Sequence, residues 1–149
     1  MIYTEMTCKA ARIAYKAHEG AVDKCGMPYI FHPLHLAEQM TDEDSTIAAL
    51  LHDVVEDTDI TLDDLRREGF SQRALEAIDL LTYREGVDYL EYVAAIKANS
   101  VAKAVKLADL AHNMDETRYN GAESRPTAER LERMRKKYSG ALAVLTEQE

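Results

Sequence analysis

Residues 50–57 read LLHDVVED, an apolar helical run that carries one histidine and three carboxylates. Burying this many polar groups costs free energy unless each finds a partner. On a helix, Glu56 stands four residues after His52 and three after Asp53, so these side chains can point toward one place. Asp57 follows four residues after Asp53, at the edge of the same face. The stretch therefore predicts a helix with a concentrated polar face.

Two interpretations of this face are open. A histidine and a carboxylate aimed at one point suit a divalent metal, and a further carboxylate nearby suits a base that acts on water. The alternative is a solvated acidic helix end. For an isolated His-Asp pair this alternative is favoured, because motifs this short often occur by chance.

Two other segments favour the metal site. His32 opens a predicted helix directly after an apolar run, which holds the histidine inward. In VKLADLAHNM, residues 105–114, the side chains of Lys106, Asp109 and Asn113 fall at i, i+3 and i+7 along one face. A face that is cationic, anionic and amide in turn is unusual for a core and suits a metal together with a phosphate ester.

Helical periodicity dominates the whole chain, and strand signals are nearly absent. Thr61 is followed three residues later by Asp64, a capping-box pair that marks a helix start. Pro126 suits the first turn of the last helix. The sequence thus predicts an all-α fold in a single domain, residues 1–149. The predicted helices span residues 3–19, 32–41, 45–57, 61–68, 71–82, 87–98, 100–118 and 125–146.

Composition and charge exclude several classes of partner. The chain is 46% hydrophobic and 30% charged, as in a globular protein, and its net charge of −9 would repel a nucleic-acid backbone. A small anionic ligand remains compatible, because a few local cations or one metal reverse the field inside a pocket. No apolar stretch approaches the roughly 20 residues of a membrane span. Sparse cysteines, Cys8 and Cys25, fit a reducing cytoplasm, and the basic run at residues 130–137 is interpreted as a solvated helix face.

Three stretches closely resemble the HD-domain phosphohydrolases: GMPYIFHP (26–33), AALLHDVVEDT (48–58) and VKLADLAHNM (105–114). The resemblance is to the hydrolase domain of the bifunctional stringent-response enzymes and to their small stand-alone relatives. It runs from about Ala17 to Asn113. A His-Asp pair alone is weak evidence, whereas four ligand positions in order with the VVEDT continuation are highly specific.

The resemblance implies an all-α helical bundle around a single divalent metal, usually manganese. The family cleaves the 3′-diphosphate from guanosine tetra- and pentaphosphate, so guanosine 3′,5′-bis(diphosphate) is the first expected substrate. Glu56 and Asp57 match the family's pair of acids, which orients or deprotonates the attacking water. The residues that match the family's metal ligands are His32, His52, Asp53 and Asp109.

Substrate contacts are covered less completely by the resemblance. Lys24 matches the lysine of the family's basic loop, and Asn113 matches the asparagine after the last ligand. Tyr138 lies roughly where the family has a nucleotide-contacting tyrosine. Lys106 is expected to hold Asp109 or to neutralise substrate.

Asp23 departs from the family pattern, since it stands where the family usually has arginine. We expect this acid to repel a phosphate, and we expect arginine at position 23 to lower the KM for guanosine tetraphosphate. Two alternatives stay open for that reason: the same machinery acting on another small nucleotide, such as a nucleoside monophosphate or a phosphorylated dinucleotide, and a nucleotide-binding sensor without turnover. The intact ligand set disfavours the sensor.

The remaining histidines are expected to lie outside the ligand set. His18 is predicted to end the first helix as a cation favoured by the helix dipole. His35 is expected at the rim of the site, and His112 follows Asp109 without a ligand role. The sequence leaves the oligomeric state open, and a homo-oligomer is compatible with it.

Overall fold

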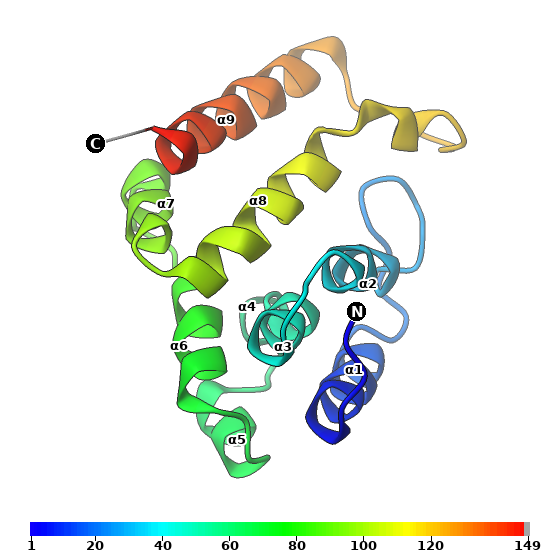
Figure 1. The fold of residues 1–149 in the computed structure, drawn as a ribbon. Coiled ribbons are helices and arrows are strands. Elements are labelled where there is room, and N and C mark those ends of the chain that lie inside the picture. Colours follow the sequence, from blue (N-terminus) through cyan, green and yellow to red (C-terminus); the bar gives the residue numbers. More distant parts are fainter. Residues whose placement is uncertain (148–149) are drawn as a thin grey trace.

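The computed structural model describes residues 1–147, and its regular elements are helices (Figure 1), which confirms the predicted all-α fold. An isolated β-bridge between Val22 and Pro28 closes the loop after the first helix. In this part of the chain no helix is both long enough and apolar enough to cross a bilayer. The elements are α1 (Glu5–Ala17), α2 (Phe31–Glu38), α3 (Glu43–Leu51), α4 (Val54–Asp57), α5 (Leu62–Arg67), α6 (Gln72–Leu81), α7 (Tyr89–Lys97), α8 (Ser100–Met114), η1 (Glu116–Tyr119) and α9 (Ala128–Thr146).

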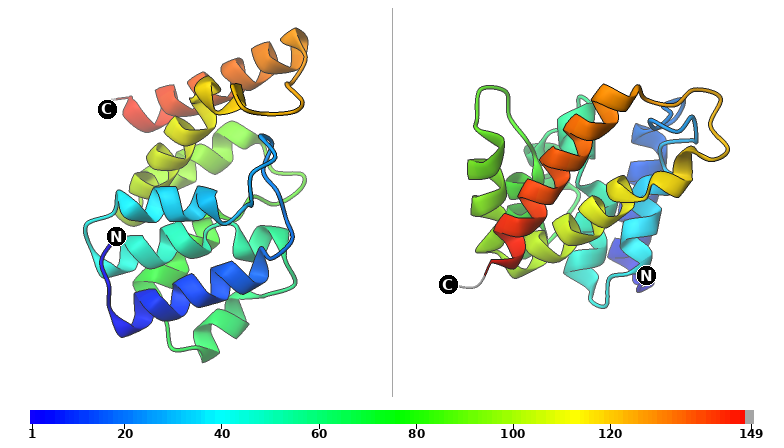
Figure 2. Two further views of the ribbon diagram at one scale, coloured as in Figure 1. Left: turned by 90° about the vertical axis from the view of Figure 1, so that its right-hand side faces the viewer. Right: turned by 90° about the horizontal axis from the view of Figure 1, so that it is seen from above.

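Helix α3 is the central element of the bundle (Figure 1). Every residue from Ser45 to Leu51 is buried, and the helix packs against α1, α2, α6 and α8. Helix α9 packs against α7 and α8 on the side of the molecule opposite α1 and α5 (Figure 2). The chain therefore leaves the end of α3, at His52, inside the protein.

The predicted helix over residues 45–57 is interrupted, because α3 ends at Leu51 and α4 begins at Val54. The His52 ring supplies the physical reason. Its Nδ1 lies 2.6 Å from the carbonyl oxygen of Ala49, so the side chain competes with the backbone N–H groups that would continue the helix. Glu56 and Asp57 therefore belong to the short α4 and not to the helix that ends at Leu51.

Helix boundaries also differ near the C-terminal end. The predicted helix 100–118 stops at Met114, because the side chain of Asp115 accepts the N–H of Thr117 at 3.1 Å and starts the short η1. Helix α9 begins at Ala128 with Thr127 as its N-cap, so Pro126 precedes the helix and is not in its first turn. The predicted capping box at residues 61–64 is confirmed.

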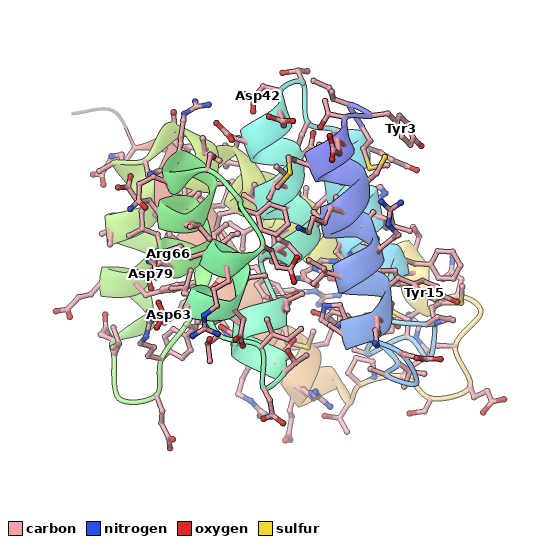
Figure 3. The ribbon with its side chains drawn as sticks, turned by 90° about the horizontal axis from the view of Figure 1, so that it is seen from below. Tyr3, Tyr15, Asp42, Asp63, Arg66 and Asp79 are labelled. Carbon is pink, nitrogen blue, oxygen red and sulfur yellow. The ribbon has the colours of Figure 1, made fainter. Side chains whose placement is uncertain are left out.

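Asp42 caps the N-terminus of α3 and lies at the edge of the molecule (Figure 3). Its Oδ1 accepts the N–H of Ser45 at 2.7 Å, and this hydrogen bond lowers the pKa of Asp42 below its usual 3.8. We expect Asp42→Ala to reduce the free energy of unfolding by about 1 kcal/mol in urea titrations at pH 7. Asp42→Asn, which keeps an acceptor oxygen, should cost much less.

The pH dependence has a definite sign. A carboxyl with a depressed folded-state pKa stabilises the fold above its unfolded pKa, and this contribution disappears as the pH falls through the folded value. The difference between wild type and Asp42→Asn should therefore shrink below about pH 4. Asp59→Ala, at an exposed loop position, is the control. Equal stability of Asp42→Ala and wild type at pH 7 would show that this cap is unimportant.

Candidate metal centre

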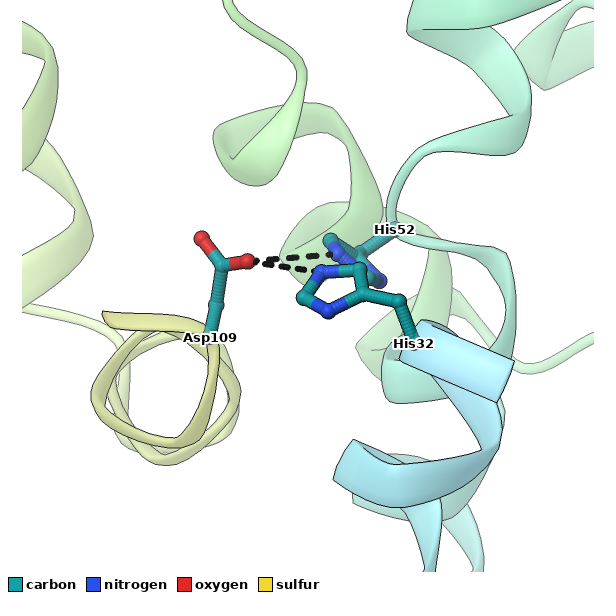
Figure 4. Close-up of side chains that lie close together, drawn as sticks. All are labelled: His32, His52 and Asp109. Atoms are coloured by element: carbon teal, nitrogen blue, oxygen red, sulfur yellow. Dashed lines mark hydrogen bonds and ion pairs between the residues drawn. The ribbon is translucent and has the colours of Figure 1, made fainter. Parts of the chain in front are cut away.

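Four side chains converge where α2, the end of α3 and α8 meet. His32 Nε2 lies 2.9 Å from Asp109 Oδ1 and 3.9 Å from Asp53 Oδ2. His52 Nε2 lies 2.9 Å from Asp53 Oδ2 and 3.8 Å from Asp109 Oδ1. Figure 4 shows both rings facing one oxygen of Asp109. Ligand atoms that each lie about 2.0–2.2 Å from one ion have separations of this size.

His52 carries a buried atom whose surroundings fit a metal. Because Nδ1 contacts the Ala49 carbonyl, that nitrogen is the donor, and Nε2 of the neutral ring carries the lone pair. Within residues 1–147 this buried Nε2 has no hydrogen-bond partner, although carboxylate oxygens lie near it. A lone pair that faces carboxylates needs a cation between them.

The pKa of His52 also indicates that a positive charge is favoured at this position. Burial disfavours the charged ring, but the carboxylates of Asp53 and Asp109 outweigh burial and raise the pKa of His52 well above its usual value. A divalent ion in place of this proton would equally neutralise the negative charge of the Asp53 and Asp109 carboxylates. Imidazole and carboxylate donors together suit such an ion.

Asp109 is a buried carboxylate that its own helix neutralises. Lys106 Nζ donates to Oδ2 at 2.9 Å, and Asn113 Nδ2 donates to Oδ1 at 3.0 Å. Burial alone would raise the pKa of Asp109, but Lys106 and the two histidines hold it well below its usual value. The three residues therefore share the face that their spacing predicts, and Lys106 holds Asp109.

Two neighbours orient the other members of the cluster. His112 Nδ1 lies 2.7 Å from His32 Nδ1. Burial, followed by the charge of Arg118, lowers the pKa of His112 to about 4, so this ring is neutral at pH 7. Tyr29 Oη donates to Asp53 Oδ2. These contacts leave His32 Nε2 and the Asp53 carboxylate directed at the same point.

Glu56 and Asp57 lie beside Asp53, with one carboxylate oxygen of each residue within 4.8 Å of the others. Glu56 Oε1 accepts the backbone N–H of Tyr83 at 2.6 Å. Both residues keep exposed surface, yet partial withdrawal from water raises the pKa of each carboxyl, and the charge of Asp53 acts in the same direction. Glu56 lines the cavity next to the cluster, whereas Asp57 is not among the lining residues.

This cavity has a volume of about 310 Å³ and contains all four residues predicted to bind substrate. Lys24 Nζ donates to the carbonyl oxygen of Asn113 at 2.9 Å and lies 5.2 Å from the centre of the Tyr138 ring. Such a volume is at the lower end of the range for small-molecule sites, about 300–1,000 Å³. The cationic residues that line the cavity are Lys24, Lys106, Arg118 and Lys137.

Two expectations need correction. His18 does end α1, but it is buried with its ring 4.7 Å from the Tyr29 ring, and burial lowers its pKa, which disfavours the predicted cationic form. Asp23 does not direct free negative charge into the cavity. Its Oδ2 accepts a hydrogen bond from Arg118 Nη2 at 3.0 Å, and its Oδ1 accepts two backbone N–H groups.

Several cavity residues have no predicted role in the sequence analysis, and Tyr29, Lys137 and Arg118 are three of them. Tyr29 lies inside the motif GMPYIFHP and could have been proposed from its place just before His32. Lys137 belongs to the supposed solvated face, yet its Nζ lies 4.6 Å from the centre of the Tyr89 ring. The predicted helix 100–118 ends at Arg118, whereas in the structure this residue lies in η1, beyond the end of α8.

Comparisons with known proteins agree with this geometry. The HD-domain family matches residues 10–140. The GTP pyrophosphokinase of Streptomyces coelicolor is 38% identical over 127 residues, which cover 74% of this chain and 14% of the relative. The guanosine-3′,5′-bis(diphosphate) 3′-pyrophosphohydrolase of Borreliella burgdorferi is 37% identical over 128 residues, which cover 74% of this chain and 19% of the relative. The chain thus spans less than one fifth of the length of these curated relatives.

Among solved structures, a metazoan orthologue of SpoT that hydrolyses ppGpp matches with a TM-score of 0.78 and 23% identity. The match covers 98% of this chain and 88% of that chain, and it shows a shared fold. The chain belongs to the HD-domain family. An HD domain implies a divalent metal site, and the cluster of His32, His52 and Asp109 is present here.

Metal binding at the cluster is testable through stability. An ion that binds only the folded state at 100 times its Kd stabilises it by about 2.7 kcal/mol, so Mn²⁺ should raise the Tm of the wild type. Asp109→Asn and His52→Ala should abolish this rise, because each removes a donor that the ion needs. Thermal melts of each variant with and without Mn²⁺, together with calorimetric titration, provide the measurement.

The control for these melts is His35→Ala, which removes an exposed imidazole that stacks on His112. It should keep the Mn²⁺-dependent rise in Tm. A full rise in Asp109→Asn would show that the ion binds elsewhere.

Proposed function

We propose that this chain is a single-domain, metal-dependent hydrolase that acts in the cytoplasm and converts guanosine 3′,5′-bis(diphosphate) and water to GDP and pyrophosphate. The observation that carries the proposal is the convergence of His32, His52, Asp53 and Asp109 at one wall of a cavity that cations also line. A relative that matches most of this chain bears the name of this pyrophosphohydrolase activity.

The metal would be held by His32 Nε2, His52 Nε2, Asp53 Oδ2 and Asp109 Oδ1. A mixed nitrogen and oxygen donor set suits Mn²⁺, which we propose as the ion. When bound, it would act as a Lewis acid that withdraws charge from the phosphate and lowers the pKa of water.

Glu56 is the proposed base. Its raised pKa brings it closer to neutral pH, where a carboxylate is a more effective proton acceptor, and the Tyr83 N–H fixes one of its oxygens. The water oxygen bonds to the phosphorus attached to the ribose 3′ oxygen, and the bond from that phosphorus to the 3′ oxygen breaks. Glu56 takes a proton from the water, and this proton is then transferred to the 3′ oxygen of GDP. Asp57, beside Glu56, keeps the local field negative and supports this transfer.

The rest of the cavity positions the nucleotide. Lys24 supplies positive charge and is fixed by the Asn113 carbonyl. Tyr138 offers an aromatic face beside Lys24. Lys106 acts indirectly, since its ammonium group is committed to Asp109.

A turnover screen with Mn²⁺ separates the possible substrates. The purified protein is incubated with guanosine tetraphosphate, nucleoside monophosphates and phosphorylated dinucleotides, and pyrophosphate and phosphate are measured separately. Release of pyrophosphate from guanosine tetraphosphate alone is the expected result. Turnover of another nucleotide alone would assign a different substrate to the same machinery, and tight binding without turnover of any would indicate a sensor.

Replacing the proposed base should separate catalysis from metal binding. We expect Glu56→Gln to lower kcat by about 10²-fold or more, the usual scale for a positioned acid–base group, while the Mn²⁺-dependent rise in Tm is retained. Glu76→Gln makes the same chemical change at an exposed position on α6 and serves as the control. Unchanged kcat in Glu56→Gln would remove this residue from the mechanism.

A further inference from the structure

Arg118 is a cation of the cavity wall that comes from η1, beyond the end of α8. Its side chain is 14% exposed, and two contacts fix its guanidinium group. Nη1 donates to the carbonyl oxygen of His112 at 2.8 Å, and Nη2 donates to Asp23 Oδ2 at 3.0 Å. A guanidinium group has five N–H donors, so these contacts leave others available to a ligand.

Asp23 is saturated by protein contacts. Its side chain is 8% exposed, and Oδ1 accepts the N–H groups of Cys25 at 2.8 Å and Met27 at 3.1 Å, while Oδ2 binds Arg118. The carboxylate thus closes its own loop and holds the guanidinium group in place.

Lys24, the next residue, brings a second cation to the same place. Burial lowers the pKa of Lys24, and the nearby positive charge of Arg118 lowers it further. The two cations are held by consecutive carbonyl groups at the C-terminus of α8, those of His112 and Asn113. That end of a helix dipole favours cations. Together Lys24, Arg118 and the carboxylate of Asp23 carry a net positive charge, which a bound anion would neutralise.

The cation pair lies close to the metal centre but is separate from it. Asn113 links them, because its side chain donates to Asp109 Oδ1 at 3.0 Å and its carbonyl oxygen accepts from Lys24. Asp109 and Asn113 are four residues apart on α8, a rise of about 6 Å. A ligand that fills the cavity therefore meets two places for anionic groups.

We propose that Arg118, positioned by Asp23 and paired with Lys24, binds the phosphate group of the nucleotide that is not cleaved. The inference rests on the proposed function. With the 3′-diphosphate at the metal centre, the 5′-diphosphate lies against the guanidinium and ammonium groups. Asp23 is a positioning residue, and Asp23→Arg should weaken binding, because it removes the partner of Arg118 and adds a like charge beside it.

Kinetics with two substrates test the proposal. In Arg118→Gln the KM for guanosine tetraphosphate should rise about tenfold or more, the scale of a lost charge-assisted hydrogen bond, with kcat within twofold. With guanosine 3′-diphosphate, which lacks the 5′ phosphates, wild type and Arg118→Gln should have the same KM. Asp23→Asn keeps an acceptor for the loop, so it should raise the KM less, and it should add nothing in an Arg118→Gln background.

Arg135→Gln is the matched control, because Arg135 pairs with Glu116 of the same η1 segment outside this cavity. Its KM should equal that of wild type. If Arg118→Gln does not fold, Arg118→Lys and Asp23→Asn test the proposal instead. Arg118→Lys keeps the positive charge and should retain most of the affinity for guanosine tetraphosphate. Asp23→Asn should still raise the KM for guanosine tetraphosphate and leave the KM for guanosine 3′-diphosphate unchanged.

Three results would overturn the proposal. A KM unchanged by Arg118→Gln, with normal wild-type turnover, refutes the role of Arg118 and leaves the proposed function standing. An equal rise in KM for both substrates would mean that Arg118 contacts the guanine base or stabilises the fold, and does not bind the 5′ phosphates. A wild type that hydrolyses neither substrate refutes the proposed function, and the inference with it.

Discussion

The buried carboxylate of Asp109 is the constraint on which the arrangement of the helices depends. Moving a carboxylate out of water costs several kcal/mol unless cations and hydrogen-bond donors surround it. Here Lys106 and Asn113 come from the same helix, and His32 comes from α2. The end of α3 brings His52 to the same oxygen. The packing of α2, α3 and α8 therefore holds together a group of polar side chains that no one of these helices could bury alone.

Charge in this protein is organised locally, against the sign of its net charge. The chain carries a net charge of −9, yet lysine and arginine side chains line the cavity. Lys106 is committed to Asp109, whereas Arg118 keeps further N–H donors beside its contact with Asp23. Lys24 is held by a carbonyl oxygen and an aromatic ring, so its charge remains available to an anion. A protein of negative net charge can therefore present a positively charged cavity to a small anionic ligand.

The sequence determined contacts within one helix better than contacts between segments. Lys106 and Asp109 meet because helical geometry fixes their spacing. The interruption after His52 could not be predicted from periodicity, because it depends on a ring nitrogen that competes for a backbone carbonyl. Asp23 and Arg118 are 95 residues apart in the chain, and only the folding of η1 against the loop pairs them. The negative charge of Asp23 could therefore be predicted from the sequence, whereas its effect on a ligand could not.

The two anion-binding places of the cavity differ in chemistry, and this difference has a consequence for the reaction. At one end, histidine and carboxylate donors suit a metal, and Glu56, the proposed base, has a carboxylate oxygen within 4.8 Å of one of Asp53. At the other end, Lys24 and Arg118 can bind a phosphate but offer neither a Lewis acid nor a base. A nucleotide with phosphates at both ends would therefore be hydrolysed at only one of them. Regioselectivity would then come from the separation between the metal ligands, which include Asp109 of α8, and the cation pair, which the carbonyl groups at the C-terminus of α8 hold.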